Sequence, residues 1–305
     1  MIFINVKTIR KLVNLGLDLI YLTPFKKSFL WLLSRLPFNY LYAYLWVNSP
    51  EYYLKSFQDD FSKKIKKAKL TYKNKHILEI GSGSSFGWGY IFILLGAKTY
   101  TASDKTRSAN MSQRAINAEL RLIKLIEKRY KKKILDKYVS LQGNLVKPLT
   151  KKLNFQILDI TANKLTNNRK YDLLISNAVF EHLPKEKVET AIKNMRALLK
   201  PGGYMLHQID LRDHFNLRQP FNFYQYSEAQ WLNLTNRGPF YTNRLRTSDY
   251  LSLFSQNGFK TIYHHQEMSQ INIKSIESKL HPSFQKYSAK DLTTCGLTIG
   301  FRRIK

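Results

Sequence analysis

Short apolar runs alternate with amphipathic stretches along the chain from residue 76 onward. Through 106–137 and again through 184–199, apolar side chains recur every three or four residues, which predicts helices with one buried face. The short runs between them predict buried strands; in chain order these span 76–80, 97–104, 155–159, 171–177 and 204–209. Strands that alternate with helices pair in parallel, so the pattern predicts a three-layer α/β sandwich.

The chain beyond residue 209 completes this pattern. Aromatic and basic residues over about 210–246 predict a lid over an acceptor. A capped helix that ends at Gly258 is expected next, and strands over 260–267 and 292–303 follow. We therefore divide the chain into a helical N-terminal extension, 1–70, and a main domain, 71–305.

The N-terminal extension is rich in aromatic side chains. Its longest uncharged stretch, 36–50, has 15 residues, whereas a membrane span needs about 20. Its polar start is also too long for a signal peptide. Two interpretations remain open: a helical cap packed on the main domain, or a segment that lies on an anionic membrane with its aromatic rings at headgroup level.

Charge and cysteine content narrow the partners. The chain carries 50 Lys and Arg against 21 Asp and Glu, a net charge of +29. Such an excess attracts nucleic acid, anionic lipid or an acidic substrate without choosing among them, and a basic solvated surface explains it equally well. The single cysteine, Cys295, excludes an internal disulfide framework and favours a reducing cytoplasm.

A glycine-rich loop, LEIGSGSSFG at 78–87, joins the first predicted strand to a helix. In a parallel sheet ligands bind beyond the carboxyl ends of the strands, and Gly81 and Gly83 let a ligand approach the backbone there. Asp104 ends the next strand, where a carboxylate can accept hydrogen bonds from both ribose hydroxyls. The loop lacks the Lys-Ser/Thr ending of a P-loop, so we expect a nucleoside ligand: a nicotinamide cofactor or S-adenosylmethionine.

Five motifs decide between these two ligands. In chain order they are Glu-x-Gly-x-Gly at 79–83, Asp104, ILDIT at 157–161, YDLLISNAVFEHLP at 171–184 and LLKPGGYML at 198–206. As a set they resemble the class I S-adenosylmethionine-dependent methyltransferases over about 76–210. The resemblance implies a Rossmann-like, mostly parallel seven-stranded sheet with an antiparallel last strand, and S-adenosyl-L-methionine as cofactor. Ser85 departs from the family, which usually has a third glycine there.

The resemblance also implies which residues contact the cofactor. They are Glu79, Gly81, Ser82 and Gly83 at the methionine end, Asp104 at the ribose, Asp159 and Ile160 at the adenine, and Asn177 near the sulfonium. In the family these positions all lie at one edge of the sheet.

Two absences argue against methylation of nucleic-acid bases. SNAVFEHL at 176–183 replaces the Asn/Asp-Pro-Pro-aromatic tetrapeptide typical of amino-directed enzymes, and Cys295 lies in an apolar C-terminal strand pattern rather than at a nucleophile position. FEHLP at 180–184 looks more like the small-molecule and lipid branches of the family. The tail after residue 210 looks like bacterial methyltransferases of cell-surface glycan type.

The stretch HQIDLRDHFN at 207–216 places ionisable side chains where acceptor-facing groups belong. We predict His214 as the general base, because imidazole titrates near neutrality, with His182 second and Asp210 as a further catalytic candidate. For both histidines the alternative is an ordinary structural role. The candidate acceptor-binding residues are Arg212, Asp213, Arg244 and Arg246. With no third acid placed by the sequence, we predict no metal.

Methyl transfer from a sulfonium requires alignment of the nucleophile and removal of a proton. We therefore predict a cytoplasmic methyltransferase that acts on an oxygen of a small-molecule or lipid-linked glycan acceptor, with peripheral contact at the inner membrane face left open. Two alternatives remain: an RNA or protein acceptor, which the positive charge favours, and a non-catalytic binding module with the same fold.

Overall fold

The computed structural model describes residues 49–107, 113–143, 145–165, 170–214, 219–237 and 241–304. Residues 1–48 lie outside these ranges, so both interpretations of the N-terminal extension stay predictions for that segment. Among the described residues, no helix is long and apolar enough to cross a membrane.

Seven strands form one sheet, and their spatial order is β5-β2-β1-β6-β7-β9-β8. All pairings are parallel except those of β9, which runs antiparallel to both of its neighbours. The strands are β1 (His76–Ile80), β2 (Thr99–Asp104), β5 (Leu153–Ile157), β6 (Tyr171–Asn177), β7 (Leu199–Asp210), β8 (Phe259–Met268) and β9 (Thr294–Arg303). This topology confirms the predicted Rossmann-like fold.

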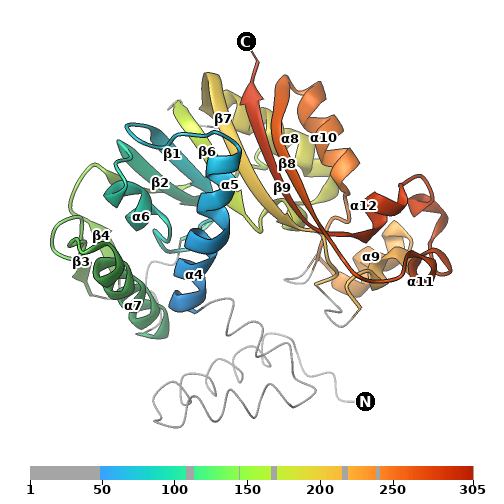
Figure 1. Cartoon of the computed structure of the whole chain (residues 1–305), viewed down its shortest axis with the longest axis horizontal. Helices are drawn as coiled ribbons and strands as arrows, with labels where there is room; N and C mark the ends of the chain where they lie inside the picture. The colour runs from blue at the N-terminus through green and yellow to red at the C-terminus, as the bar shows by residue number, and fades with distance from the viewer. Residues whose placement is uncertain are drawn as a thin grey trace, which may run out of the picture.

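Helices cover both faces of the sheet (Figure 1). One face carries α4 (Pro50–Ser56), the π-helix η1 (Phe57–Phe61), α5 (Ser62–Lys67), α6 (Gly89–Leu94) and α7 (Gln113–Tyr130). The opposite face carries α8 (Val188–Leu198) and α10 (Thr247–Gln256). We call these the α6 face and the α8 face. Because successive strand residues point to opposite faces, each face buries its own set of side chains.

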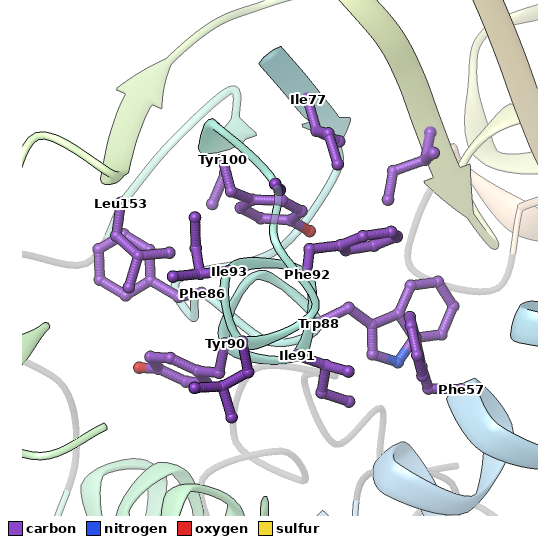
Figure 2. Packing of buried hydrophobic residues seen from close by; sticks show 14 of the residues in the cluster. Phe57, Ile77, Phe86, Trp88, Tyr90, Ile91, Phe92, Ile93, Tyr100 and Leu153 are labelled. Atoms are coloured by element: carbon purple, nitrogen blue, oxygen red, sulfur yellow. The ribbon is translucent and has the colours of Figure 1, made fainter. Parts of the chain in front are cut away.

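Aromatic rings dominate the core on the α6 face (Figure 2). Phe61 stacks on Trp88 with ring centroids 4.4 Å apart, and Phe92 stacks on Tyr100 at 5.6 Å. Phe57 packs edge-on against Trp88 at 5.7 Å. Offset and edge-on pairs of this kind each add about 0.5–1.5 kcal/mol beyond the area they bury. The helices of residues 50–67 are therefore part of the same core as the sheet.

The structure differs from the predicted elements at four places. β5 spans Leu153–Ile157 rather than 155–159, so Asp159 lies beyond the strand that was expected to end there. β7 begins at Leu199 and includes the Lys-Pro-Gly-Gly stretch that was expected to precede it. α7 ends at Tyr130 rather than near 137. A two-stranded antiparallel ribbon, β3 (Val139–Gln142) and β4 (Leu145–Pro148), follows α7 and was not predicted. Apart from the shift of β5, these changes leave the candidate site residues where they were predicted.

The predicted lid is half of a small inserted subdomain with its own hydrophobic core. Its first half holds η4 (Asn222–Gln225) and α9 (Glu228–Thr235), and its second half holds α11 (Ile273–Glu277), η5 (Pro282–Phe284) and α12 (Ala289–Thr293). Trp231, Phe223 and Phe284 meet in that core. Residues 241–247 are buried as a strap between the subdomain and the sheet, so they do not form a surface lid.

Candidate active site

The carboxyl ends of five strands bring polar side chains together on the α6 face. These are Glu79 of β1, Asp104 of β2, Asn177 of β6, Gln208 and Asp210 of β7, and Glu267 of β8. Each of the first five residues comes two or four positions after a residue whose side chain is buried in the core of that face. Because side chains alternate between the two faces along a strand, all five point to the same face. Candidate cofactor and acceptor groups therefore lie side by side in strand order.

The glycine loop after β1 closes against its neighbours. Gly81 has φ +74°, and a Cβ there would lie 2.4 Å from Val179 Cγ2. Gly83 has φ +67°, faces open space and donates its N–H to Asp104 Oδ2 at 3.0 Å. The loop backbone and the Asp104 carboxylate thus line one opening, while Ser82 donates its hydroxyl back to Gly83 O at 3.3 Å.

Glu119 of α7 holds the second half of the glycine loop, and sequence reasoning did not identify it. Its Oε1 accepts hydrogen bonds from Ser85 Oγ at 3.1 Å, Phe86 N at 3.2 Å and Tyr90 Oη at 2.5 Å. Burial raises the pKa of this carboxyl, although the three bonds act in the opposite direction. Ser85 therefore serves as a hydrogen-bond donor where the family usually has glycine. The sequence signal that could have identified Glu119 is the position of an acidic residue within the apolar face of α7.

Glu79 lies near the end of β1, directly before the glycine loop. Its carboxyl is buried and accepts a short hydrogen bond from the Tyr100 hydroxyl. Burial raises the pKa of Glu79 to about 7, against the effect of that hydrogen bond. Its side chain is therefore held against β2 and does not reach into open solvent.

The predicted adenine residues behave differently from each other. Asp159 is exposed just beyond β5, and its Oδ1 accepts hydrogen bonds from Thr161 N at 2.8 Å and Thr161 Oγ1 at 2.6 Å. The Ile160 side chain is buried in the core of the α8 face. A contact with adenine through that side chain is therefore not supported, and only the Ile160 backbone could take part.

Three predicted acceptor-side residues meet at the end of β7. Arg212 donates to both oxygens of Asp210, at 2.9 and 2.7 Å, and His214 Nε2 lies 3.3 Å from Asp210 Oδ2. Burial alone would raise the pKa of Asp210, but the bonds from Arg212 and His214 hold it below its usual range. A carboxylate in this position orients the imidazole and stabilises its protonated form.

His182 completes the cluster from the turn after β6. Its ring centroid lies 4.9 Å from that of His214. Its Nδ1 is 2.9 Å from Tyr241 O; because a carbonyl only accepts, we assign the proton to Nδ1, which leaves Nε2 as an acceptor. Desolvation and the neighbouring His214 lower the pKa of His182. A neutral histidine with a free acceptor nitrogen can take a proton from a substrate.

A second buried carboxyl, Glu181, lies directly behind this cluster. Its Oε1 accepts from the Asp210 backbone N–H at 3.1 Å, and no described residue hydrogen-bonds to its Oε2. Burial and the nearby Asp210 charge raise the pKa of Glu181 to about 8. The sequence motif contained this residue, but a role could be seen only once the turn was placed against β7.

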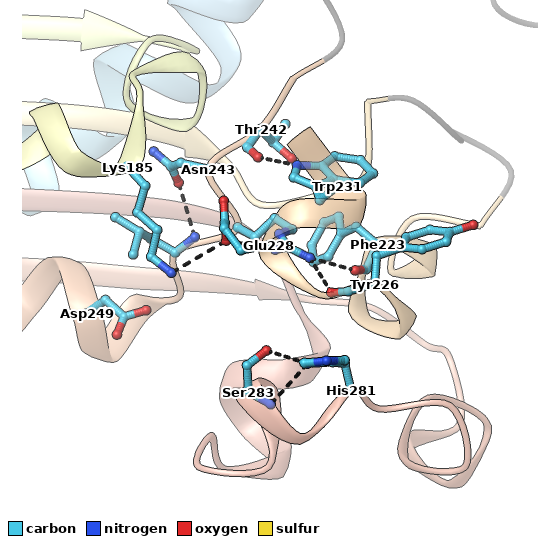
Figure 3. Close-up of polar contacts among 12 residues, drawn as sticks. Lys185, Phe223, Tyr226, Glu228, Trp231, Thr242, Asn243, Asp249, His281 and Ser283 are labelled. Carbon is cyan, nitrogen blue, oxygen red and sulfur yellow. Dashed lines mark hydrogen bonds and ion pairs between the residues drawn. The ribbon is translucent and has the colours of Figure 1, made fainter. Parts of the chain in front are cut away.

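Arg244 and Arg246 are buried and already paired within the protein, so the structure gives no support to the prediction that they bind the acceptor. Arg244 donates to Phe223 O at 3.1 Å and Tyr226 O at 2.7 Å and pairs with Glu228 at 2.7 Å (Figure 3). Arg246 is fully buried, and its donors reach main-chain carbonyls of Leu211, Asp291 and Thr294. Both guanidinium groups hold the inserted subdomain to the sheet.

Two further residues of the 207–216 stretch are also buried. Asp213 has no exposed surface, and its N–H donates to Pro220 O at 2.7 Å, so the predicted acceptor contact through its carboxylate is not supported. His207 faces the opposite side of β7, between Phe180 and Phe254, with Nδ1 2.8 Å from Ser176 Oγ. Burial lowers the pKa of His207 to about 3, which keeps it neutral.

A comparison with protein-family models shows the family of the chain. The family model described as a methyltransferase domain matches residues 52–264, more than two thirds of the chain. The chain belongs to this methyltransferase family. It is an S-adenosylmethionine-dependent methyltransferase, and a loop that leaves open space over Gly83 beside a strand-end carboxylate fits that cofactor. No curated protein sequence matches the chain significantly.

Several solved structures of methyltransferases are similar to the chain at low sequence identity. Magnesium protoporphyrin IX methyltransferase (ChlM) from Synechocystis PCC 6803 with bound SAH has 11% identity and a TM-score of 0.46, covering 84% of this chain and 85% of that one. An S-adenosylmethionine dependent methyltransferase from Mesorhizobium loti has 13% identity and a TM-score of 0.45, covering 79% of this chain and 96% of that one. N-methyltransferase NodS from Bradyrhizobium japonicum WM9 has 16% identity and a TM-score of 0.41, covering 82% of this chain and 97% of that one.

Proposed function

We propose that this methyltransferase transfers the methyl group to an oxygen of a small-molecule or glycan-type acceptor. The observation that carries the proposal is the cluster of Asp210, His214 and His182 at the ends of β6 and β7, beside Asn177. A hydroxyl must lose its proton when it is methylated, and this cluster supplies two imidazoles and an orienting carboxylate for that purpose.

The chain's own residues would divide the work as follows. S-adenosylmethionine, when bound, supplies an activated methyl group. The backbone of Gly81 and Gly83 would hold its methionine end, and Asp104 its ribose hydroxyls. Asn177, at the end of β6, would lie near the methyl group. These assignments follow the strand order, because β2, β1 and β6 are consecutive neighbours in the sheet.

Proton removal is assigned to His214. If Nε2–H donates to Asp210, Nδ1 is the acceptor nitrogen that would take the proton of the acceptor hydroxyl as that oxygen is methylated. The resulting imidazolium is stabilised by the Asp210 carboxylate. The products are the methyl ether, S-adenosylhomocysteine and a proton that returns to solvent. His182 is the second candidate for the same step.

Replacement of His214 tests this role directly. His214→Ala should lower turnover about 10²–10⁴-fold, the usual effect of losing a general base, while the affinity for S-adenosylhomocysteine stays unchanged. Transfer of labelled methyl to a panel of hydroxyl-bearing acceptors measures the first quantity, and titration calorimetry measures the second. Turnover within a few-fold of wild type would show that His182, or alignment alone, performs the step.

A polyanionic acceptor is the second candidate function, and the exposed charge of α7 favours it. The exposed cations on and after this helix are Arg121, Lys124, Lys128, Arg129, Lys131, Lys132 and Lys133. If RNA binds there, affinity should fall steeply with salt, because each neutralised phosphate releases counterions. Salt-independent binding of the acceptor would favour the uncharged class.

Peripheral membrane contact is a further part of the proposal. The chain enters α4 at the carboxyl edge of the sheet (Figure 1). The Trp88 indole of the glycine-loop region donates to Tyr53 O of this helix at 3.2 Å. The aromatic segment before residue 49 therefore joins the domain at the same edge as the glycine loop. A segment that lies on the inner leaflet would bring this edge to a lipid-linked acceptor.

A further inference from the structure

A lysine held between two carboxylates connects the N-terminal helices to the far edge of the sheet. Lys64 Nζ of α5 lies 2.8 Å from Asp60 Oδ2 and 3.0 Å from Glu267 Oε1 of β8. Gln208 of β7 donates to the same Asp60 oxygen at 2.6 Å. We call Asp60, Lys64, Gln208 and Glu267 the polar wall. None of these residues was singled out by the sequence.

The polar wall lies where the strand order places an acceptor. Gln208 is the register partner of Asn177, the residue assigned to the methyl end of the cofactor. Glu267 lies two strands further, across β9, and neighbouring strands are about 4.8 Å apart. The wall therefore begins about one strand from Asn177 and extends roughly 10 Å away from the cofactor residues. His214 and Asp210 lie at the same end of β7.

The exposed part of the wall is acidic although the protein is strongly basic. The side chains of Asp60 and Glu267 are 48% and 52% exposed, whereas that of Lys64 is 8% exposed. An approaching ligand therefore meets carboxylate oxygens and not the ammonium. Asp60 Oδ1 and Glu267 Oε2 accept no hydrogen bond from the described residues. Two carboxylates and one ammonium leave the wall with a net negative charge.

Two backbone features give the wall its shape. Asp60 belongs to the π-helix Phe57–Phe61, and single π turns inside helices often mark functional sites. Gly296 of β9 pairs with both Asp210 and Glu267, and a Cβ there would lie 2.8 Å from Glu267 Oε2. The missing side chain lets Glu267 lie across β9 toward Asp210.

A separate observation points to the same end of β7. Glu181, 2% exposed, hydrogen-bonds the Asp210 backbone through Oε1, while Oε2 has no partner among the described residues. A hydrogen-bond donor delivered to this end of the sheet would meet the carboxylates of Asp210 on β7, Glu267 on β8 and Asp60 on the π-helix, with Glu181 of the turn after β6 behind Asp210.

We propose that the polar wall is the acceptor-binding surface and that Asp60 and Glu267 select a neutral, hydroxyl-bearing acceptor such as a sugar residue over a phosphorylated one. This inference rests on the proposed transfer to oxygen and specifies its substrate class. Ionised carboxylates only accept hydrogen bonds, so they bind hydroxyl donors. They repel phosphate and carboxylate groups, which makes like charge the basis of the discrimination.

Sugar binding to the protein saturated with S-adenosylhomocysteine tests the proposal. The probes are methyl glucoside and N-acetylglucosamine, with glucose 6-phosphate and N-acetylglucosamine 6-phosphate as the charged pair, titrated by saturation-transfer NMR. The wild type should bind the neutral sugars at least tenfold more tightly than the phosphates. The double variant Asp60→Asn, Glu267→Gln should bind neutral sugars about 10- to 100-fold more weakly and lose the discrimination.

The control is Glu189→Gln, an exposed acid of α8 on the opposite face of the sheet, whose carboxylate pairs with Lys193 of the same helix. It should keep both the affinity and the preference of the wild type. A purely structural wall would change the unfolding midpoint but not the ratio of neutral to phosphorylated affinities, so an unchanged ratio in a folded double variant overturns the inference. Wild type that binds the phosphates equally well, or neither neutral sugar, also overturns it.

Failure of the proposed function gives a different result. One such result is that S-adenosylhomocysteine binds and the sugar preference is as expected, while His214→Ala keeps full methyl transfer. In that case the polar wall is the acceptor-binding surface, and His214 is not the general base. If S-adenosylhomocysteine fails to bind in calorimetry, the cofactor residues are misassigned irrespective of the wall.

Discussion

Glu119→Ala should loosen the glycine loop and lower both stability and cofactor affinity. In the wild type, one carboxylate oxygen accepts three hydrogen bonds, from Ser85, Phe86 and Tyr90. Phe86 and Tyr90 are buried, so their donors cannot turn to water when the acceptor is removed. The Ser85 hydroxyl is partly exposed and can.

The size of the effect follows from those two buried donors. An unsatisfied buried donor costs about 1–3 kcal/mol, so Glu119→Ala should lower the free energy of unfolding by about 2–6 kcal/mol. Domains of this kind have about 5–15 kcal/mol in total, so the variant should remain folded at low temperature. If about 1.4 kcal/mol of the loss acts on the loop alone, the affinity for S-adenosylhomocysteine falls about tenfold.

Glu119→Gln is the informative companion. All three donors meet the same oxygen, Oε1, and the amide oxygen of glutamine can take its place, so this variant should lose less than half as much stability as the alanine variant. Urea unfolding gives the free energies, titration calorimetry gives the affinities, and Glu189→Ala serves as control. The proposed role of Glu119 in holding the glycine loop would be refuted if the alanine and glutamine variants lost equal stability. It would also be refuted if the alanine variant had the unfolding free energy and the affinity of the wild type.

Three further predictions concern the cofactor, pH and the membrane. Asp104→Ala should lose binding of S-adenosylhomocysteine in calorimetry, since a charged hydrogen bond contributes about 1.5–3 kcal/mol; unchanged affinity removes the ribose assignment. Burial holds the pKa of Glu181 near 8 against an ordinary 4.5, so the folded state retains a proton that the unfolded chain releases, and stability should fall as pH rises from 4.5 to 8. Glu181→Gln should flatten this fall in urea titrations, whereas parallel curves for both proteins would contradict the shift. The chain should float with anionic but not neutral liposomes at low salt, because nine aromatics lie in 21–48 and five lysines just after α4 are exposed, Lys63, Lys66, Lys67, Lys69 and Lys73, each lysine near the surface adding about 1 kcal/mol; absence from the anionic fraction leaves the N-terminal segment as a structural cap.

The sequence by itself determined the sheet and the cofactor edge. Buried strands must be short apolar runs, and parallel strands must end at one edge, so the positions of Gly81, Gly83, Asp104 and Asn177 followed from local pattern. The resemblance of the motifs carried the family, and the match over 52–264 confirmed it. These features are local in the chain, which is why a reading of neighbouring residues could find them.

The tertiary structure alone decided what each charged side chain does. Arg246 and Arg212 look equivalent in sequence, yet one is fully buried on main-chain carbonyls and the other is half exposed on Asp210. Glu267 and Lys64 are 203 residues apart and meet at 3.0 Å. Burial sets the free-energy cost of a charged side chain, and residues distant in the chain supply its hydrogen-bond partners. Neither can be inferred from the residues next to it in the sequence.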